Sequence, residues 1–412
     1  EDGGTIYVGA GASSENYAHA DGSEGAYAYL EHSDSAYAYG LDFSYSSEDH
    51  SGDVLNEGFI AAFAVAGDSE DEGRQEAYAN SEGDDASASV DHEANAGAVG
   101  ARVQASSFEN SGLIGADARA YSLAYAHADA DDGEATADAE ASAEAVSTGL
   151  FLIGDDIYST FDNSGAISGL AHAYAYAVAD AEGSGSSYAE ADATAHAYAY
   201  GANFSEGSTF DTITNSEDGL IEAHATAEAS ESENEESSSG YASAEAVGMA
   251  LSGAGFTTLQ NDGVIEATAS AEEYAFARGI DLTHISYPSL NGEIINTGTI
   301  SAIASSDNAY ATAILFDEGV DVSLIRNTGS IYAAVYDYRD EGEDYSGEDG
   351  HAIAIDIRGA STPVTIEQLD GEIIGDVRME NALADYLNWS GGTITGDIYG
   401  DQEDGDYLNV FA

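Results

Sequence analysis

Several residue types are absent from the sequence or nearly so. It has no cysteine and no lysine, and its 412 residues include 2 prolines, 1 tryptophan and 8 basic residues, all arginine. Without cysteine the chain cannot form a disulfide framework, a thiolate zinc site, an iron–sulfur cluster or a c-type haem attachment. No apolar run approaches the roughly 18 residues of a membrane-spanning helix. The chain starts at Glu1 with neither Met nor an apolar signal region, so we expect a mature or trimmed segment.

The scarcity of basic residues leaves a strong negative charge. Asp and Glu number 78, and the formal net charge is −70 at pH 7. Such a field repels phosphate backbones, so nucleic acid is not expected as a partner. Acidic disordered chains are poor in aromatic and β-branched residues, whereas this chain has 27 Tyr, 12 Phe and 43% hydrophobic residues. We therefore predict a folded chain.

A short pattern, Asn-x-Gly-x-Ile followed by small residues, recurs along the sequence. Copies start at Asn56, Asn110, Asn163, Asn215 (a looser one), Asn261, Asn296 and Asn327, and degenerate copies lie at 4–6, 370–373 and 391–394. The spacings between the seven copies are 54, 53, 52, 46, 35 and 31 residues. We predict an N-terminal coil or cap over 1–55, solenoid repeats over 56–368 and C-terminal coils with a cap over 369–412.

The shortest repeat, residues 296–327, shows how one unit is built. Three runs of alternating apolar and polar residues are separated by polar turns, which predicts three strands. The Asn and Gly of the pattern are expected at a corner with positive φ. One such unit cannot bury its own apolar face, but stacked units build a continuous core. The sequence thus predicts an all-β fold, a right-handed parallel β-solenoid.

The longer repeats carry an additional Ala-rich segment. Ala alternates with polar residues over 113–130, and again over 135–145, after which Phe151 and Ile153 are expected to continue on the inward face. Because residues i and i+2 point apart on a helix, this alternation favours two long strand arms per coil that pack Ala against Ala. The early coils would then carry a thin flange beside a thicker body. An Ala-rich helix is the alternative, since Ala and Glu favour helices intrinsically.

The residues between the alanines are expected to face outward and form rows along the solenoid axis. In 113–130 these residues include Leu123 and His127; His172, His196 and His224 hold similar positions and predict a surface row rather than a metal site. Tyrosines recur at outward positions and predict an aromatic ladder, which either stabilises the sheet or binds a carbohydrate or another chain. The candidate binding residues are Tyr121, Tyr125, Tyr174, Tyr176, Tyr198 and Tyr200.

Acidic residues gather at the expected turns and arm tips. Carboxylates stacked at the spacing of the coils repel each other unless cations bridge or screen them, and hard oxygen ligands suit Ca²⁺. A solvated surface adapted to saline water is the alternative interpretation. The candidate Ca²⁺ ligands are Asp68, Glu70, Asp71, Asp131, Asp132, Asp340, Glu341, Glu343, Asp344, Asp404 and Asp406.

The repeat pattern resembles a known class of surface protein. Residues 296–302, Asn-Thr-Gly-Thr-Ile-Ser-Ala, and residues 327–333, Asn-Thr-Gly-Ser-Ile-Tyr-Ala, are similar to the β-helix repeats of bacterial autotransporter passengers. The tail from Ser390 resembles the C-terminal end of such a passenger. The resemblance implies a secreted or surface-displayed protein, often an adhesin or aggregation factor. The long Ala arms and the extreme acidity depart from the usual pattern.

Together these features predict an extracellular or cell-surface structural protein rather than an enzyme. We expect it to self-associate into a filament, sheet or matrix, with cations bridging its acidic surface. One alternative is a monomeric adhesin that binds glycans or another cell surface. A second alternative is a polysaccharide lyase or hydrolase, in which Arg326, Arg339, Arg358 and Arg378 could serve a site instead of pairing with nearby acids.

Overall fold

The computed structural model describes residues 4–23, 25–43, 53–67, 74–82, 85–154, 159–205, 207–231, 237–285, 292–336, 351–401 and 405–411. Within these ranges the chain forms strands and turns and no helix, and every strand pairing is parallel. The Ala-rich segments are strands, so the helical alternative is wrong. The chain is a parallel β-solenoid, as the sequence predicts; its right-handed sense stays a prediction.

Three sheets run the length of the solenoid. The first contains β1 (Thr5–Ala12), β5 (Phe59–Ala66), β9 (Leu113–Ala130), β12 (Ala166–Gly183), β15 (Leu220–Glu231), β18 (Val264–Ala271), β21 (Thr299–Ser305), β24 (Ser330–Tyr336), β27 (Glu372–Ile374) and β30 (Thr393–Thr395), with β2 (Asn16–Gly22) and β6 (Gln75–Ser81) extending its early strands. The second contains β3 (Ala26–Phe43), β7 (Ala86–Ala105), β10 (Ala135–Gly154), β13 (Ser187–Phe204), β16 (Ser237–Ser252), β19 (Tyr274–Thr283), β22 (Asn308–Phe316), β25 (His351–Asp356), β28 (Asp376–Arg378) and β31 (Ile398–Tyr399). The third contains β4 (Asp53–Asn56), β8 (Ser107–Asn110), β11 (Ser159–Asn163), β14 (Thr209–Asn215), β17 (Gly255–Asn261), β20 (Gly292–Asn296), β23 (Val322–Asn327), β26 (Thr365–Gln368), β29 (Tyr386–Trp389) and β32 (Tyr407–Val410).

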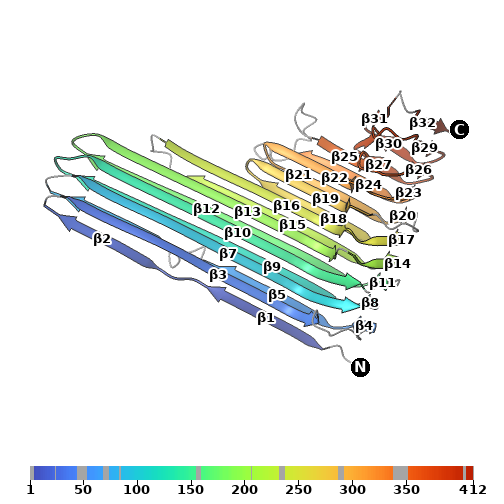
Figure 1. Ribbon diagram of the computed structural model, residues 1–412, viewed down its shortest axis with the longest axis horizontal. Coiled ribbons are helices and arrows are strands. Elements are labelled where there is room, and N and C mark those ends of the chain that lie inside the picture. Colours follow the sequence, from blue (N-terminus) through green and yellow to red (C-terminus); the bar gives the residue numbers. More distant parts are fainter. Residues whose placement is uncertain are drawn as a thin grey trace.

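Each coil passes through the three sheets in turn, and the described residues make ten coils. The shortest repeat behaves as expected, because residues 296–327 form β21, β22 and β23. Strands of the first and second sheets shorten toward the C-terminus, so the early coils extend far beyond the later ones (Figure 1).

The body of the solenoid is filled by three columns of large aliphatic and aromatic residues, one from each sheet. The column of the first sheet runs from Ile6 through Ile60 and Ile114 to Ile394. The second, in which Ala101 and Ala202 replace larger residues in two coils, runs from Leu41 to Ile398, and the third runs from Val54 to Leu408. Between the two ends these side chains are almost fully buried. Stacking thus gives each unit the apolar cover that it cannot provide for itself.

The early coils also carry the predicted flange, which we define as the facing Ala-lined arms, residues 116–147 in the third coil and their equivalents. Ala118, Ala126, Ala137 and Ala143 are at most 2% exposed, while the residues between them reach the surface. Ala side chains are short, which lets two sheets approach more closely than the usual ~10 Å.

Two details of the alternation differ from expectation. Phe151 and Ile153 are only half-buried, whereas Leu150 and Leu152 fill the core. The inward face changes at Gly149, since Ser147 and Leu150 on either side of it are both buried, and a Cβ at Gly149 would lie 2.7 Å from the Gly201 carbonyl oxygen. The expectation that Leu123 faces solvent is also wrong, since Leu123 is 6% exposed.

The recurring Asn side chains form a buried ladder at the corner before each strand of the first sheet. Each amide nitrogen donates to the side-chain oxygen of the next coil at 2.7–2.8 Å. The ladder comprises Asn56, Asn110, Asn163, Asn215, Asn261, Asn296, Asn327 and Gln368.

The pattern requires glycine for a different reason from the expected positive φ. Positive φ occurs at Gly371 and Gly392, but the glycines of the seven earlier copies do not show it. A Cβ at Gly112 would lie 2.0 Å from the Gly58 carbonyl oxygen, and one at Gly298 would lie 2.0 Å from that of Gly263. Close approach of successive coils therefore requires glycine there.

Candidate functional site

The six predicted tyrosines are divided between the outer faces of the first and the second sheet rather than forming one ladder. On β9 and β12 the ring of Tyr125 lies 5.7 Å from that of Tyr176, and the Arg74 guanidinium lies 3.8 Å from the centre of the Tyr125 ring. Tyr121 and Tyr174 are register partners on the same strands. Tyr198 and Tyr200 lie on β13, across the flange.

A longer aromatic row, which the sequence analysis missed, follows the outer face of the second sheet. We call it the aromatic ribbon: Tyr198, His196, Tyr241, Tyr274, Phe276, Tyr310 and His351. Neighbouring ring centres are 5.2–6.4 Å apart. Tyr241 and Tyr310 are the most exposed of its tyrosines, at 38% and 36%. The alternation of Tyr or Phe with Ala at 274–277 and 309–311 was the available signal.

Carboxylates do form a row, on the same outer face of the second sheet. This acidic ladder consists of Glu31, Asp91, Glu140 and Asp192, which are register partners in four successive coils. Burial, followed by neighbouring carboxylates, raises the pKa of both Asp91 and Glu140 above their usual values. Beside the ladder, the pKa of Asp138 is raised for the same reasons. The surface therefore favours bound protons or cations.

Most of the predicted Ca²⁺ ligands lie outside the described residues: Asp68, Glu70, Asp71, Asp340, Glu341, Glu343, Asp344 and Asp404. Asp131 and Asp132 are at the turn between β9 and β10. Asp406 accepts the backbone N–H groups of Asp385 at 3.0 Å and Asp401 at 2.6 Å, which is the work of a turn-stabilising side chain. Among the residues that the structure describes, no three His, Asp or Glu gather as a metal site.

The four predicted histidines are likewise divided between the two faces, His196 on the second sheet and the others on the first. His127 stacks on Tyr78 at 4.9 Å and meets Asp180 at 3.1 Å. Burial lowers the pKa of His172 and of His196, whereas the hydrogen bond with Glu222 raises that of His224.

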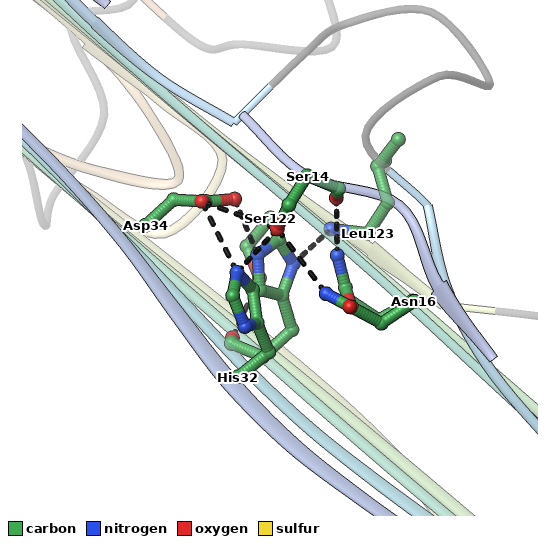
Figure 2. A network of polar contacts seen from close by, with 8 residues as sticks. Ser14, Asn16, His32, Asp34, Ser122 and Leu123 are labelled. Carbon is green, nitrogen blue, oxygen red and sulfur yellow. Dashed lines mark hydrogen bonds and ion pairs between the residues drawn. The ribbon is translucent and has the colours of Figure 1, made fainter. Parts of the chain in front are cut away.

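One polar network lies inside the flange, where the first sheet is interrupted between β1 and β2 (Figure 2). His92 is fully buried and accepts the Leu123 N–H at Nδ1, so its proton sits on Nε2, which faces Asp34 at 3.4 Å. Burial lowers the pKa of His92. His32 stacks on His92 and meets both Ser14 and Asp34.

This network combines Ser, His and Asp but not in the geometry of a nucleophilic triad. Ser14 Oγ and Asp34 Oδ1 both contact Nε2 of His32, at 2.5 and 3.2 Å. A triad needs the two partners on opposite nitrogens of the ring, so that the carboxylate orients the base toward the nucleophile. The arrangement instead supplies hydrogen bonds where Ala packing is broken.

The arginines that could have served a catalytic site are paired with acids. The pairs in the described C-terminal region are Arg326 with Glu367 (2.9 Å), Arg358 with Asp356 (2.6 Å) and Arg378 with Asp376 (3.8 Å), while Arg339 lies outside the described residues. These guanidinium groups act within local ion pairs on the solenoid surface.

Among the described residues, no strand packs over the core columns at the first and the last coil. At the N-terminal end Ile6, Leu41 and Val54 line a hollow of about 360 Å³, together with Phe43. Leu408 is 51% exposed on the last coil. The strands of both coils are sheet edges, with backbone groups paired on one side.

Comparison with protein families, curated proteins and solved structures finds no match. In the described part of the chain no helix is long and apolar enough to cross a membrane.

Proposed function

We propose that this protein is a structural subunit that stacks end to end into a filament, and that cations control the stacking. The observation that carries the proposal is that the three core columns continue into the first and the last described coil, where Ile6 is 38% and Leu408 51% exposed. If the last coil of one copy sits on the first coil of the next, Ile394, Ile398 and Leu408 meet Ile6, Leu41 and Val54. The parallel pairing of strands continues across the junction, and such a head-to-tail contact gives an open filament.

We attribute the control of stacking to the negative charge of the chain. A chain of net charge −70 repels its copies over a distance set by ionic strength. Glu57 lines the hollow at one end, and Asp397 lies on the last coil. Ca²⁺, with its preference for carboxylate oxygens, would bridge these groups and the acidic ladder. In this proposal Ca²⁺ binds between surface carboxylates and needs no single site with a full set of protein ligands.

We place this assembly at the cell surface or outside the cell, on the resemblance of the Asn-x-Gly-x-Ile repeat to autotransporter passengers. The parallel solenoid supports that resemblance at the level of the fold alone. Proteolysis of intact producing cells tests the location: an external protein is digested, and a protein inside intact cells is protected.

Sedimentation velocity tests the assembly. We expect large species in millimolar Ca²⁺, monomers in EDTA, and monomers in NaCl of the same ionic strength if bridging rather than screening dominates. Leu408→Glu should remain monomeric in Ca²⁺, because it puts a charge on the end of a core column. Leu369→Glu, at an exposed Leu away from the end coils, is the matched control and should assemble normally. A monomeric wild type in Ca²⁺, or normal assembly of Leu408→Glu, overturns the proposal.

A further inference from the structure

We propose that the cluster of His32, Asp34 and His92 inside the flange is a pH-sensitive latch, which holds the arms of the first coils together and releases them in acid. The latch lies away from the end coils used in stacking. It therefore does not depend on the proposed assembly.

His92 occupies a position that holds Ala in later coils. Its register partner in the next coil is Ala141, and the partner of Ala141 is Ala193. His92 is nevertheless fully buried. A buried imidazole in an Ala-lined interior needs a partner for each ring nitrogen, because a buried polar atom without one is destabilising. The groups around the ring thus decide which protonation state fits.

The partner of Nδ1 ties the ring to the opposite sheet. Backbone pairing of β9 with β5 ends at Ala120, and its pairing with β6 begins at Ala124. The Leu123 N–H lies in this interval and donates to Nδ1 of His92 at 3.1 Å (Figure 2). Ser122 Oγ donates to the His92 carbonyl oxygen at 2.7 Å. These two bonds join β9 of the first sheet to β7 of the second across the flange.

The partner of Nε2 is a carboxylate that two imidazoles share. The Nε2–H of His92 faces Asp34 Oδ2 at 3.4 Å, and Nε2 of His32 contacts Asp34 Oδ1 at 3.2 Å. The two rings stack with their centres 5.9 Å apart. One carboxylate balances one imidazolium, so protonation of both rings leaves an excess positive charge inside the flange.

The surroundings do not supply a second negative charge. Arg74 pairs with Glu76 at 3.5 Å, and Asp91 and Glu93 alternate with His92 on β7, so they point to the outer face. Among the described residues, Asp34 is the acid that pairs with both rings. The other side chains described around the cluster are uncharged: Ser14, Asn16, Gln75, Ser122 and Leu123.

A proton added to His92 does not fit this geometry. It would sit on Nδ1 and point at the Leu123 N–H, so that one donor would face another. Burial likewise lowers the pKa of His92 from its ordinary 6.5. The stabilising contribution of the neutral ring is therefore fully present above pH 6.5 and is lost as the pH falls through the lowered value. In acid the bond to Leu123 breaks and the arms separate.

Hydrogen exchange measured by mass spectrometry on the full chain tests the latch. EDTA keeps the chain from assembling through cations, and the intrinsic pH dependence of exchange is divided out. A His that stays neutral in the closed arms but titrates at about 6.5 in the open ones raises the open population about tenfold between pH 7.5 and pH 5.5. We expect that increase in β7 and around Leu123, and no change in β22 of the later coils.

Two variants assign the response to the ring. His92→Gln does not titrate, but it keeps an amide oxygen for the Leu123 N–H and an NH₂ group for Asp34, so exchange in β7 should be the same at both pH values. His127→Gln is the matched control. His127 lies on the outer face of the flange, where it meets Asp180 at 3.1 Å, and the variant should keep the tenfold response.

Histidine-selective NMR of the wild type follows the ring without any substitution, and the His92 resonance should titrate below the ordinary 6.5. Three results would overturn the proposal. The first is a change of less than twofold in β7 exchange of the wild type. The second is the same pH response in His92→Gln as in the wild type, which would assign it to carboxylates. The third is titration of His92 at 6.5 or above while β7 stays protected, which would show that the closed flange accommodates the proton.

Discussion

Substituting Asn215 by Ala is the sharpest test of how the coils are joined. Asn215 is 1% exposed. Its amide nitrogen donates to Asn261 Oδ1 at 2.8 Å and to the Val264 carbonyl at 3.1 Å, and its oxygen accepts from Asn163 at 2.8 Å. The change leaves Asn261 Oδ1 buried without its ladder donor, whereas Asn163 keeps two carbonyl acceptors.

The magnitude follows from these bonds. A buried acceptor left without a donor costs about 1–3 kcal/mol, and the bond lost by Asn163 adds about 1 kcal/mol, so we expect a loss of about 2–4 kcal/mol. Because each coil contacts only its neighbours, the loss should be concentrated near β11, β14 and β17. Amide exchange governed by local opening would then be about 30- to 1,000-fold faster there.

Hydrogen exchange measured by mass spectrometry checks this expectation. Gln260→Ala is the control, because Gln260 is next to the ladder on β17 but bonds Asp262 at the surface; it should change local stability by less than about 0.5 kcal/mol. Exchange in Asn215→Ala within threefold of the wild type would refute the view that the buried ladder holds the coils together.

Three further changes probe the flange, the glycine at which the inward face changes, and the C-terminal coils. Ala193→Leu, inside the flange, should cost about 1–3 kcal/mol in thermal unfolding, while the outward Thr194→Leu should be nearly neutral; equal effects would contradict Ala-to-Ala packing. Gly201→Ala puts a Cβ 2.5 Å from the Gly248 carbonyl oxygen, so amide hydrogen exchange around residue 201 should become faster. Unchanged exchange would show that the backbone shifts to accommodate the methyl group. Burial raises the pKa of Asp385 from 3.8 to about 6, so its stabilising contribution is fully present below pH 3.8 and is lost as pH rises through 6. Protection of the β29 amides from hydrogen exchange should therefore be greater at pH 5 than at pH 7, and Asp385→Asn should remove the difference. If the pH dependence persists in Asp385→Asn, it arises from other groups.

Much of the fold could be predicted because the repeat places the same residue at the same point of every coil. Ile60, Ile114 and Ile167 are successive members of one core column, and Asn110 and Asn163 are successive members of one ladder. Strict alternation of Ala likewise allowed the flange to be predicted, since only a strand keeps i and i+2 on one face.

The errors have local physical causes. Alternation was extended through Gly149 to Phe151, but the inward and outward faces exchange at that glycine. Positive φ was expected at the repeat glycines, whereas at Gly112 the requirement is space for the neighbouring carbonyl. Neither feature is visible without knowing how closely adjacent coils approach.

The aromatic ribbon was missed for a different reason. Its members come from coils of unequal length, so Tyr241, Tyr274 and Tyr310 have no constant spacing in the sequence. Only the strand register, for example Phe276 beside Tyr310, brings them together. The internal network is similar, since Ser14, between β1 and β2, meets His32 of β3 across the flange.

Electron microscopy in millimolar Ca²⁺ tests the central claim, end-to-end stacking, most directly. Stacked copies of the ten coils that the structure describes, at about 4.8 Å each, would give an axial repeat of roughly 48 Å, and the flange should project from one side once per repeat. The account predicts filaments with that repeat, which disperse in EDTA and are absent in Leu408→Glu. Single short particles in both Ca²⁺ and EDTA, or an assembly without the 48 Å repeat, would contradict it.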